Sequence, residues 1–257
     1  MKVCRFKYNN EVRFGVIKDD LIFPVDDFSN LQGAEFLTLT ESIGQSDVKF
    51  LPPVIPSKIV CVGRNYVEHA KELGNEVPAE PLIFLKPPSS LIADGDPIIY
   101  PAISQNVHFE GELGVVIGTR ARHVPREEAL EYIAGYTCLN DVTARDIQRK
   151  DVQFTRGKGF DTFCAVGPSL TPRAEIDLQS LRVITRLDGE VKQEAPVTDM
   201  IFPVDAIIAF VTTCMTLEPG DLIATGTPSG VGPMQPGQTV EVEIPGVGLL
   251  RNTVIRG

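Results

Sequence analysis

The chain has 257 residues, of which 43% are hydrophobic and 23% are charged, a balance typical of a globular protein with a buried core. Its net charge of −10 argues against a nucleic-acid partner, because phosphate binding needs clustered lysine and arginine. The start of the chain lacks the apolar segment of a signal peptide, and no apolar run is long enough to span a bilayer, so we expect a soluble cytoplasmic protein with no membrane partner.

Residues 1–50 are predicted to form a small N-terminal β domain, because alternating stretches such as Val12–Ile17 are separated by turn pairs such as Asn9-Asn10. Prolines keep residues 51–56 extended, as in a linker into a main domain at 51–257. The five cysteines form no CxxC pair, so we expect buried free thiols in a reducing compartment.

The main domain is predicted to open with a strand at Lys58–Val62 and a short helix, which Asn65 caps and Gly74 ends. Strands outnumber helices and no βαβ rhythm occurs, which favours an α+β, β-rich fold with mixed sheets over a doubly wound sheet. Helices are predicted from Pro125 to Gly135, just after Asp141, and from Pro203 to before Glu218. Further strands are predicted at Leu82–Leu85, Ile98–Tyr100, Glu110–Ile117, Gly135–Leu139, Thr239–Ile244 and Leu249–Val254.

Two glutamates, Glu110 and Glu112, open a predicted strand that continues into the apolar run Val115–Ile117. Side chains alternate along a strand, so both carboxylates point to one face, where their charges repel unless a proton or a cation bridges them. Asp141 ends another apolar stretch. Oxygen ligands of this kind favour a hard cation such as Mg²⁺, Mn²⁺ or Ca²⁺. Spacing alone also fits a solvated glutamate pair and an aspartate that caps a helix.

His69 and Glu72 lie three residues apart on the helix predicted after Gly63, so their side chains can touch. A carboxylate hydrogen-bonded to an imidazole orients the ring and raises its basicity, and such a pair can deprotonate a water molecule. An ordinary surface pair is also common at this spacing. His108 and His123 lack such a context and are expected to be structural or surface residues.

Three further side chains are candidates for contact with a ligand. Lys158 lies between two glycines that let the backbone bend toward a cleft, although most lysines in such loops are solvated. Arg145 and Gln148 share one helix face and can hold a carboxylate or carbonyl group, but Arg145 can instead pair with Asp146.

The segment Gly226–Gly232 superficially suggests a phosphate-binding loop. It lacks the Gly-Lys-Ser/Thr ending of a P-loop, which argues against nucleotide binding.

Five short phrases occur in order between about Pro56 and the C-terminus: Gly63-Arg64-Asn65-Tyr66, Phe84-Leu85-Lys86-Pro87, Glu110-x-Glu112-Leu113-Gly114, Asp141-Val142-Thr143-Ala144-Arg145-Asp146 and Thr225-Gly226-Thr227-Pro228-Ser229-Gly230-Val231-Gly232. Together they closely resemble the fumarylacetoacetate hydrolase family. Within the family, the chain is most similar to the branch of acylpyruvases, oxaloacetate decarboxylases and 2-hydroxyhepta-2,4-diene-1,7-dioate isomerases.

The resemblance implies a mixed β-roll catalytic domain at residues 51–257, preceded by the small N-terminal β domain, in a homodimer. It implies a divalent cation, Mg²⁺ or Mn²⁺ with Ca²⁺ as the alternative, bound by Glu110, Glu112 and Asp141. It also implies catalytic roles for His69, Glu72 and Lys158. The first two would form a histidine–glutamate dyad that acts as the general base on a lid helix. The substrate-binding residues that it implies are Arg64, Arg145, Gln148 and Thr227.

The expected substrate is a small 2-oxo acid that chelates the cation. The cation in turn stabilises the pyruvate enolate that forms when the C3–C4 bond breaks. Acylpyruvate hydrolysis and oxaloacetate decarboxylation both give this enolate. Isomerisation of 2-hydroxyhepta-2,4-diene-1,7-dioate needs only proton transfer at a similar enol and is the alternative reaction. A non-catalytic small-ligand binding module and a calcium-stabilised structural protein are alternatives from other classes.

Overall fold

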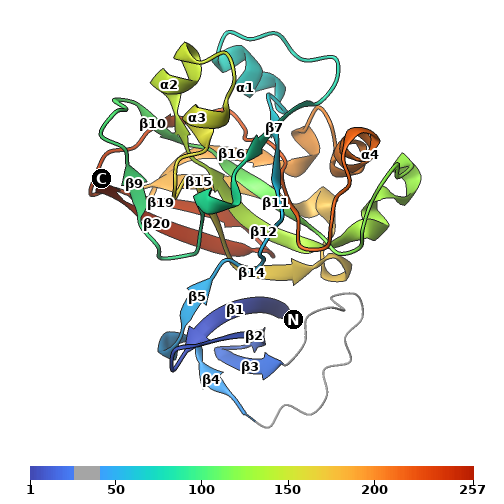
Figure 1. The fold of residues 1–257 in the computed structure, drawn as a ribbon, viewed down its shortest axis with the longest axis vertical. Helices are drawn as coiled ribbons and strands as arrows, with labels where there is room; N and C mark the ends of the chain where they lie inside the picture. The colour runs from blue at the N-terminus through green and yellow to red at the C-terminus, as the bar shows by residue number, and fades with distance from the viewer. Residues whose placement is uncertain (26–40) are drawn as a thin grey trace.

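The N-terminal strands form a small antiparallel meander, as the alternation of apolar residues predicted (Figure 1). Asn9 and Asn10 join the first two strands with positive φ angles of 48° and 67°, as a two-residue hairpin turn requires. The computed structural model describes residues 1–25 and 41–257, so residues 26–40 of the predicted N-terminal domain lie outside the described residues. The strands are β1 (Lys2–Tyr8), β2 (Glu11–Lys18), β3 (Leu21–Val25), β4 (Ile43–Gly44) and β5 (Lys49–Leu51).

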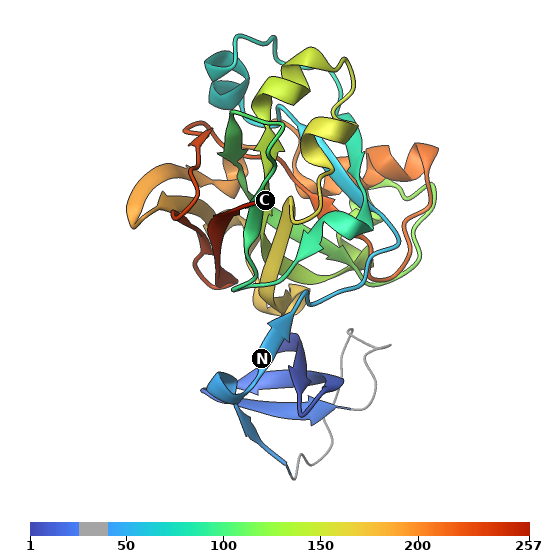
Figure 2. The same cartoon turned by 60° about the vertical axis from the view of Figure 1, so that its left-hand side comes forward.

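Strand β1 also belongs to the main sheet, which continues from it in the order β1-β14-β12-β11-β17-β6-β7. Strands β11 and β12 lie at its centre and are buried along their whole length, which explains their nearly continuous apolar sequences. Strand β5 leads from the meander into this larger part (Figure 2). The added strands are β6 (Ile59–Gly63), β7 (Leu82–Lys86), β8 (Leu91–Ile92), β11 (Gly111–Ile117), β12 (Ile133–Asp141), β14 (Cys164–Pro172) and β17 (Leu222–Ala224).

Two smaller sheets complete the β structure, in the orders β13-β10-β18 and β16-β15-β19-β20-β9. Most neighbouring strands are antiparallel, but β17 runs parallel to β6, β20 to β9 and β8 to β14. The predicted β-rich fold with mixed sheets is therefore confirmed. The strands are β9 (Ile98–Tyr100), β10 (Val107–Phe109), β13 (Thr143–Ala144), β15 (Arg182–Leu187), β16 (Glu190–Pro196), β18 (Gly232–Pro233), β19 (Thr239–Ile244) and β20 (Gly248–Arg256).

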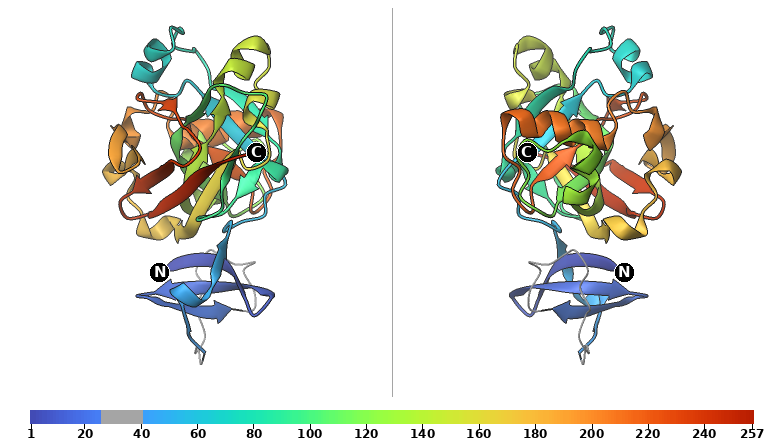
Figure 3. Two further views of the ribbon diagram at one scale, coloured as in Figure 1. Left: turned by 90° about the vertical axis from the view of Figure 1, so that its left-hand side faces the viewer. Right: turned by 90° about the vertical axis from the view of Figure 1, so that its right-hand side faces the viewer.

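The helices are short, and three of them lie together at the end of the molecule farthest from the meander (Figure 1). These are α1 (Val67–Glu72), α2 (Arg145–Lys150) and α3 (Thr155–Lys158). The longer α4 (Val204–Cys214) buries one face in the largest apolar core, formed with β11, β12 and the five-stranded sheet (Figure 3). The described residues include no helix that is long and apolar enough to cross a membrane.

The structure corrects the prediction for the segment after Pro125 and for one cysteine. The helix predicted from Pro125 to Gly135 is a 3₁₀ helix at Arg126–Tyr132, and it ends early because β12 begins at Ile133. Cys214 is exposed at the end of α4, whereas the other four cysteines are buried, as expected, and all five are free thiols. The remaining 3₁₀ helices are Gln45–Asp47, Pro88–Ser90, Arg173–Glu175, Leu178–Ser180 and Val197–Asp199.

A buried carboxylate, Asp221, fixes the segment that precedes β6 against the turn that precedes β17. Its Oδ1 accepts hydrogen bonds from Ser57 N at 2.9 Å, Ser57 Oγ at 2.7 Å and Lys58 N at 3.1 Å, and its Oδ2 accepts one from Glu218 N at 2.8 Å. The ammonium group of Lys58 also pairs with Oδ2. Burial alone would raise the pKa of Asp221, but these donors outweigh it and lower the pKa below its usual value.

We expect Asp221→Ala to lower the free energy of unfolding by about 2–4 kcal/mol at neutral pH, because it leaves buried donors unpaired. Because the folded-state pKa of Asp221 is lowered, its contribution is full above the usual aspartate range and is lost as the pH falls through the folded value. Urea unfolding of wild type and variant at several pH values measures this. The exposed Asp161, which has no side-chain partner in the described part of the chain, is the control; an equal loss in Asp161→Ala would contradict the prediction.

Candidate active site

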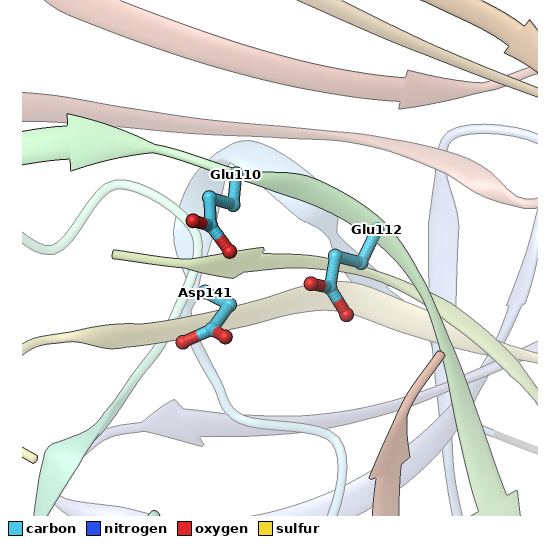
Figure 4. Close-up of side chains that lie close together, drawn as sticks. All are labelled: Glu110, Glu112 and Asp141. Carbon is cyan, nitrogen blue, oxygen red and sulfur yellow. The ribbon is translucent and has the colours of Figure 1, made fainter. Parts of the chain in front are cut away.

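Strand pairing brings the three predicted carboxylates together. Glu110 lies just before β11, where its N–H donates to Asn140 Oδ1 at 2.9 Å and its carbonyl oxygen accepts from Asp141 N at 2.9 Å. Glu112, two residues along, points to the same side because side chains alternate along the strand. One carboxylate oxygen from each of Glu110, Glu112 and Asp141 lies within 4.8 Å of the others, and all three residues are buried (Figure 4).

Three cationic side chains surround these carboxylates. Lys158 Nζ donates to Glu110 Oε2 at 2.9 Å, to Asp141 Oδ2 at 2.6 Å and to Thr143 Oγ1 at 2.8 Å, so all three ammonium protons are used. Lys86 Nζ donates to Asp141 Oδ1 at 2.5 Å. Arg145 pairs with Glu110. Two of the three carboxylates therefore have protein counterions.

These contacts set the protonation states of Glu110 and Lys158. Burial alone would raise the pKa of Glu110, but the charges of Lys158 and Arg145 outweigh it and lower the pKa well below the usual range. Burial would likewise lower the pKa of Lys158, whereas Asp141 and Glu110 raise it above its ordinary value. Glu110 is therefore an anion and Lys158 a cation at neutral pH.

Glu112 differs from its two neighbours, because no cationic side chain in the described part of the chain pairs with it. Its Oε2 accepts one hydrogen bond, from Gly226 N at 2.8 Å. Burial and the charges of Asp141 and Glu110 raise the pKa of Glu112 well above the ordinary value. A buried carboxylate without a counterion, beside two other carboxylates, fits a hard divalent cation with oxygen ligands. The residues present therefore suit Mg²⁺, Mn²⁺ or Ca²⁺.

His69 and Glu72 form the contact that their spacing predicted. His69 is buried on α1, and its Nδ1 lies 3.2 Å from Glu72 Oε2. Glu72 Oε1 also accepts a hydrogen bond from Gly230 N at 3.0 Å, which ties α1 to the turn after β17. Nδ1 is therefore engaged with a carboxylate, and Nε2 is the ring atom left to exchange a proton with a ligand.

The prediction that Asn65 caps this helix is wrong, because Tyr66 occupies the N-cap position and makes no side-chain capping bond. The buried Asn65 amide instead donates to Thr225 O at 2.7 Å and to Phe202 O at 3.0 Å. The same residue packs against Gly226, where an added Cβ would lie 2.6 Å from Asn65 Cβ. Only glycine allows this close approach, through which the backbone of Gly226 reaches Glu112.

A single cavity of about 240 Å³ collects the predicted residues. Nine of the ten line it, and the tenth, Glu72, contacts His69 from α1. His108 is half-buried outside the cavity lining, with a pKa lowered by burial and by Arg145 to about 4, and His123 is exposed; that the two are structural or surface residues stays a prediction. The lining consists of Val62, Gly63, Arg64, His69, Leu73, Asn75, Phe84, Glu110, Glu112, Asp141, Arg145, Gln148, Arg149, Phe154, Lys158 and Thr227.

Several of these side chains already have protein partners. Arg145 donates to Gln148 Oε1 at 2.7 Å and pairs with Glu110, not with Asp146. Asp146 instead accepts from Ser104 and Gln105. The Thr227 hydroxyl donates to Gly111 O at 2.9 Å and accepts from Gln193 Nε2 at 2.7 Å, so its proton is not free for a ligand.

Sequence reasoning missed Lys86, which is 1% exposed and donates a hydrogen bond to Oδ1 of Asp141. A signal was present, because Lys86 ends the apolar segment Leu82–Lys86 and lies two residues after Phe84, on the same side of the strand. Phe84 itself covers Lys158, whose Nζ lies 5.1 Å from the ring centroid. Arg149, one turn after Arg145 on α2, is a second missed lining residue.

Family models match both parts of the chain. The model described as fumarylacetoacetate (FAA) hydrolase C-terminal matches residues 58–255, and the model described as Rv2993c-like, N-terminal, matches residues 1–53. A mitochondrial oxaloacetate decarboxylase of Dictyostelium discoideum is 47% identical over 74% of this chain and 89% of that protein. The mitochondrial human oxaloacetate tautomerase FAHD2A is 42% identical over 82% of this chain and 71% of that protein.

Solved structures agree with these matches. The 2-hydroxyhepta-2,4-diene-1,7-dioate isomerase of Mycobacterium marinum superimposes with a TM-score of 0.90 at 40% identity, over 100% of this chain and 98% of that one. A maleylpyruvate hydrolase from Sphingobium sp. SYK-6, in complex with manganese(II) and pyruvate, gives 0.83 at 31% identity over 100% of both chains. With the family model covering most of its length and relatives this similar, the chain belongs to the fumarylacetoacetate hydrolase family.

Proposed function

We propose that this protein is a divalent-metal-dependent enzyme that cleaves the C3–C4 bond of small 2-oxo acids, by acylpyruvate hydrolysis and by oxaloacetate decarboxylation. The observation that carries the proposal is Glu112, a buried carboxylate that has no counterion among the described residues and faces the same cavity as His69. Relatives named for oxaloacetate and for maleylpyruvate support both reactions. A homodimer and a cytoplasmic location stay predictions from the sequence.

Glu110, Glu112 and Asp141 would hold the cation, and Mn²⁺ or Mg²⁺ is the proposed metal. When bound, the cation supplies a Lewis acid for the 2-oxo acid end of the substrate, where it stabilises negative charge as the C3–C4 bond breaks. The relative solved with manganese(II) and pyruvate supports this pairing of metal and product class. Calcium is the alternative that the oxygen donors allow.

In the proposed hydrolysis, His69 Nε2 takes a proton from water while the water oxygen attacks the distal carbonyl carbon. The C3–C4 bond then breaks, a carboxylic acid leaves, and C3 of the pyruvate enolate takes up a proton. Glu72 holds Nδ1 of the ring, which orients His69 and favours its protonated form during the step.

In the proposed decarboxylation no water attacks, because breaking the same bond releases CO₂ and leaves the same enolate. Gln148 would bind the substrate through its amide Nε2, since its Oε1 accepts from Arg145. Thr227 would contact the substrate only as an acceptor or after its hydroxyl leaves Gly111 O. Isomerisation or tautomerisation at the same enol is the second candidate, favoured by the isomerase and tautomerase among the relatives.

We expect turnover of acetylpyruvate and of oxaloacetate with Mn²⁺ or Mg²⁺, and loss of both activities on chelation. His69→Gln should lower hydrolysis by about 10²- to 10⁴-fold, because it removes the general base, and leave decarboxylation nearly unchanged. Steady-state assays of both substrates measure this, with the rate of free metal ions subtracted for oxaloacetate. His123→Gln is the matched control, since His123 is exposed and outside the cavity lining.

Four outcomes would contradict the proposal. Turnover that persists without metal would remove the role of the carboxylates. An equal loss of both reactions in His69→Gln would show that His69 is not a base specific to hydrolysis. Binding without turnover of any 2-oxo acid would favour a small-ligand binding module, and melting curves that depend on calcium without any binding or turnover would favour a structural protein.

A further inference from the structure

The cavity is cationic although the whole chain is acidic. Four cationic side chains line it, Arg64, Arg145, Arg149 and Lys158, against the three carboxylates Glu110, Glu112 and Asp141. The chain as a whole has a net charge of −10. Any divalent cation on the carboxylates would increase this local excess of positive charge. The charge of the cavity therefore selects for an anionic ligand, and more strongly for a dianion than for a monoanion.

Two of the four cations are committed to protein partners and two are not. Lys158 and Arg145 pair with the carboxylates. Neither Arg64 nor Arg149 makes a side-chain hydrogen bond or an ion pair with any part of the chain that the structure describes. Arginine without a partner in a cavity is suited to a planar anion, because its guanidinium group donates two parallel hydrogen bonds to a carboxylate.

The backbone places both arginines at the rim of the same cavity. Arg149 lies four residues after Arg145 on α2, so both side chains project from one face; Arg145 is buried against Glu110, whereas Arg149 is exposed. Arg64 follows β6 with a φ of 57°, a left-handed conformation that is uncommon outside glycine and asparagine. Such a conformation at a cavity wall is typical of a residue positioned for a ligand.

We infer that Arg64 and Arg149 form a subsite for the second carboxylate of a dicarboxylic 2-oxo acid, while the carboxylate trio and its cation hold the 2-oxo acid end. This inference rests on the proposed function for the orientation of the substrate, and it deepens that function by assigning selectivity for dianions to two named residues.

The subsite has different consequences for the two proposed reactions. Arginines that hold a carboxylate stabilise its anionic form, which opposes its loss as neutral CO₂. They do not oppose attack of water at a carbonyl group between the two carboxylates. The subsite therefore favours hydrolysis of an acylpyruvate whose acyl arm ends in a carboxylate. For oxaloacetate it would contribute binding only, and the acceleration of the proposed decarboxylation would come from the cation at the other end of the substrate.

Calorimetric binding of two unreactive acids with the same carbon skeleton tests this, with Mn²⁺ present. The probes are 2-oxoglutarate, a dianion, and 2-oxopentanoate, a monoanion. We expect wild type to bind the dianion at least about tenfold more tightly, and each of Arg64→Met and Arg149→Met to weaken it about tenfold while the monoanion changes less than about twofold. Lys150→Met, on the same helix but outside the cavity lining, is the control and should change neither.

Equal affinity of wild type for the two acids, or no binding of either, would overturn the subsite. An equal effect of Lys150→Met and Arg149→Met would do the same, because it would show only a long-range effect of charge. Since the readout is binding, it is separate from turnover. A preference for the dianion in a protein that cleaves no 2-oxo acid would retain the subsite and refute the proposed function.

Discussion

Glu112→Gln is expected to lower kcat/KM for every 2-oxo acid by about 10³-fold or more while it raises the melting temperature of the metal-free protein. Activity falls because a neutral amide is a far weaker ligand for a hard cation than a carboxylate, and several kcal/mol of charge stabilisation are lost with the cation. The fold gains stability because Glu112 is buried beside Asp141 and Glu110, with no counterion from residues 1–25 or 41–257.

The expected gain in stability is about 1–2 kcal/mol, or about 2–8 °C for a chain of this size. Glutamine keeps the shape of Glu112 and can still accept from Gly226 N. Because burial and neighbouring charges raise the folded-state pKa of Glu112, the wild type gains stability as the pH falls, and the difference between the two proteins should shrink. Steady-state kinetics and melting curves with chelator measure both effects.

Glu128→Gln, at an exposed glutamate of the 3₁₀ helix Arg126–Tyr132, is the matched control and should change neither quantity. Full activity of Glu112→Gln would show that the reaction does not need Glu112 as a metal ligand and would contradict the proposed metal site. If the variant instead melts at a lower temperature than wild type without metal, Glu112 has a structural role that its contacts do not suggest.

Lys158→Met is expected to destabilise the metal-free protein by about 3–5 kcal/mol, because it leaves Glu110 and Asp141 as buried charges without the ammonium group they share. A divalent cation should restore most of this stability, since it can take over the neutralisation of both carboxylates. Activity should not return, because we propose that Lys158 would exchange one of its present hydrogen bonds for one to the substrate oxygen that becomes negative.

Thermal melts with and without Mn²⁺, beside kinetics with saturating Mn²⁺, separate these two roles. Lys192→Met is the control, because Lys192 makes a partly exposed ion pair with Glu190 at 2.7 Å, and its loss should change stability by less than about 1 kcal/mol. An unchanged melting temperature in metal-free Lys158→Met would show that the bridge does not stabilise the fold. Full activity of the metal-loaded variant would show that the lysine is not needed for the reaction.

Local patterns were sufficient to place most elements of the main domain. The strands at Ile98–Tyr100 and Thr239–Ile244 have the predicted bounds, because period-two alternation and flanking turn residues are local properties of the sequence. Capping was less predictable. Asn65 precedes α1 and has a typical capping side chain, yet it bonds to the segments at Phe202 and Thr225, and only the folded chain brings those segments close.

The sequence by itself determined the β-rich class, the pairing of Glu110 with Glu112, and the contact of His69 with Glu72, because each follows from the repeat of a strand or a helix. Only the tertiary structure decided which of the three carboxylates have a cationic side chain as counterion. Lys86 and Lys158 lie 55 and 17 residues from Asp141, and no repeat in the sequence relates them to it. The contacts of Lys86 on β7 and of Lys158 on α3 with Asp141, at the end of β12, leave Glu112 as the carboxylate without a counterion among the described residues. The carboxylates were visible in the sequence, but the charge that remains for a cation and a substrate depends on contacts between distant segments.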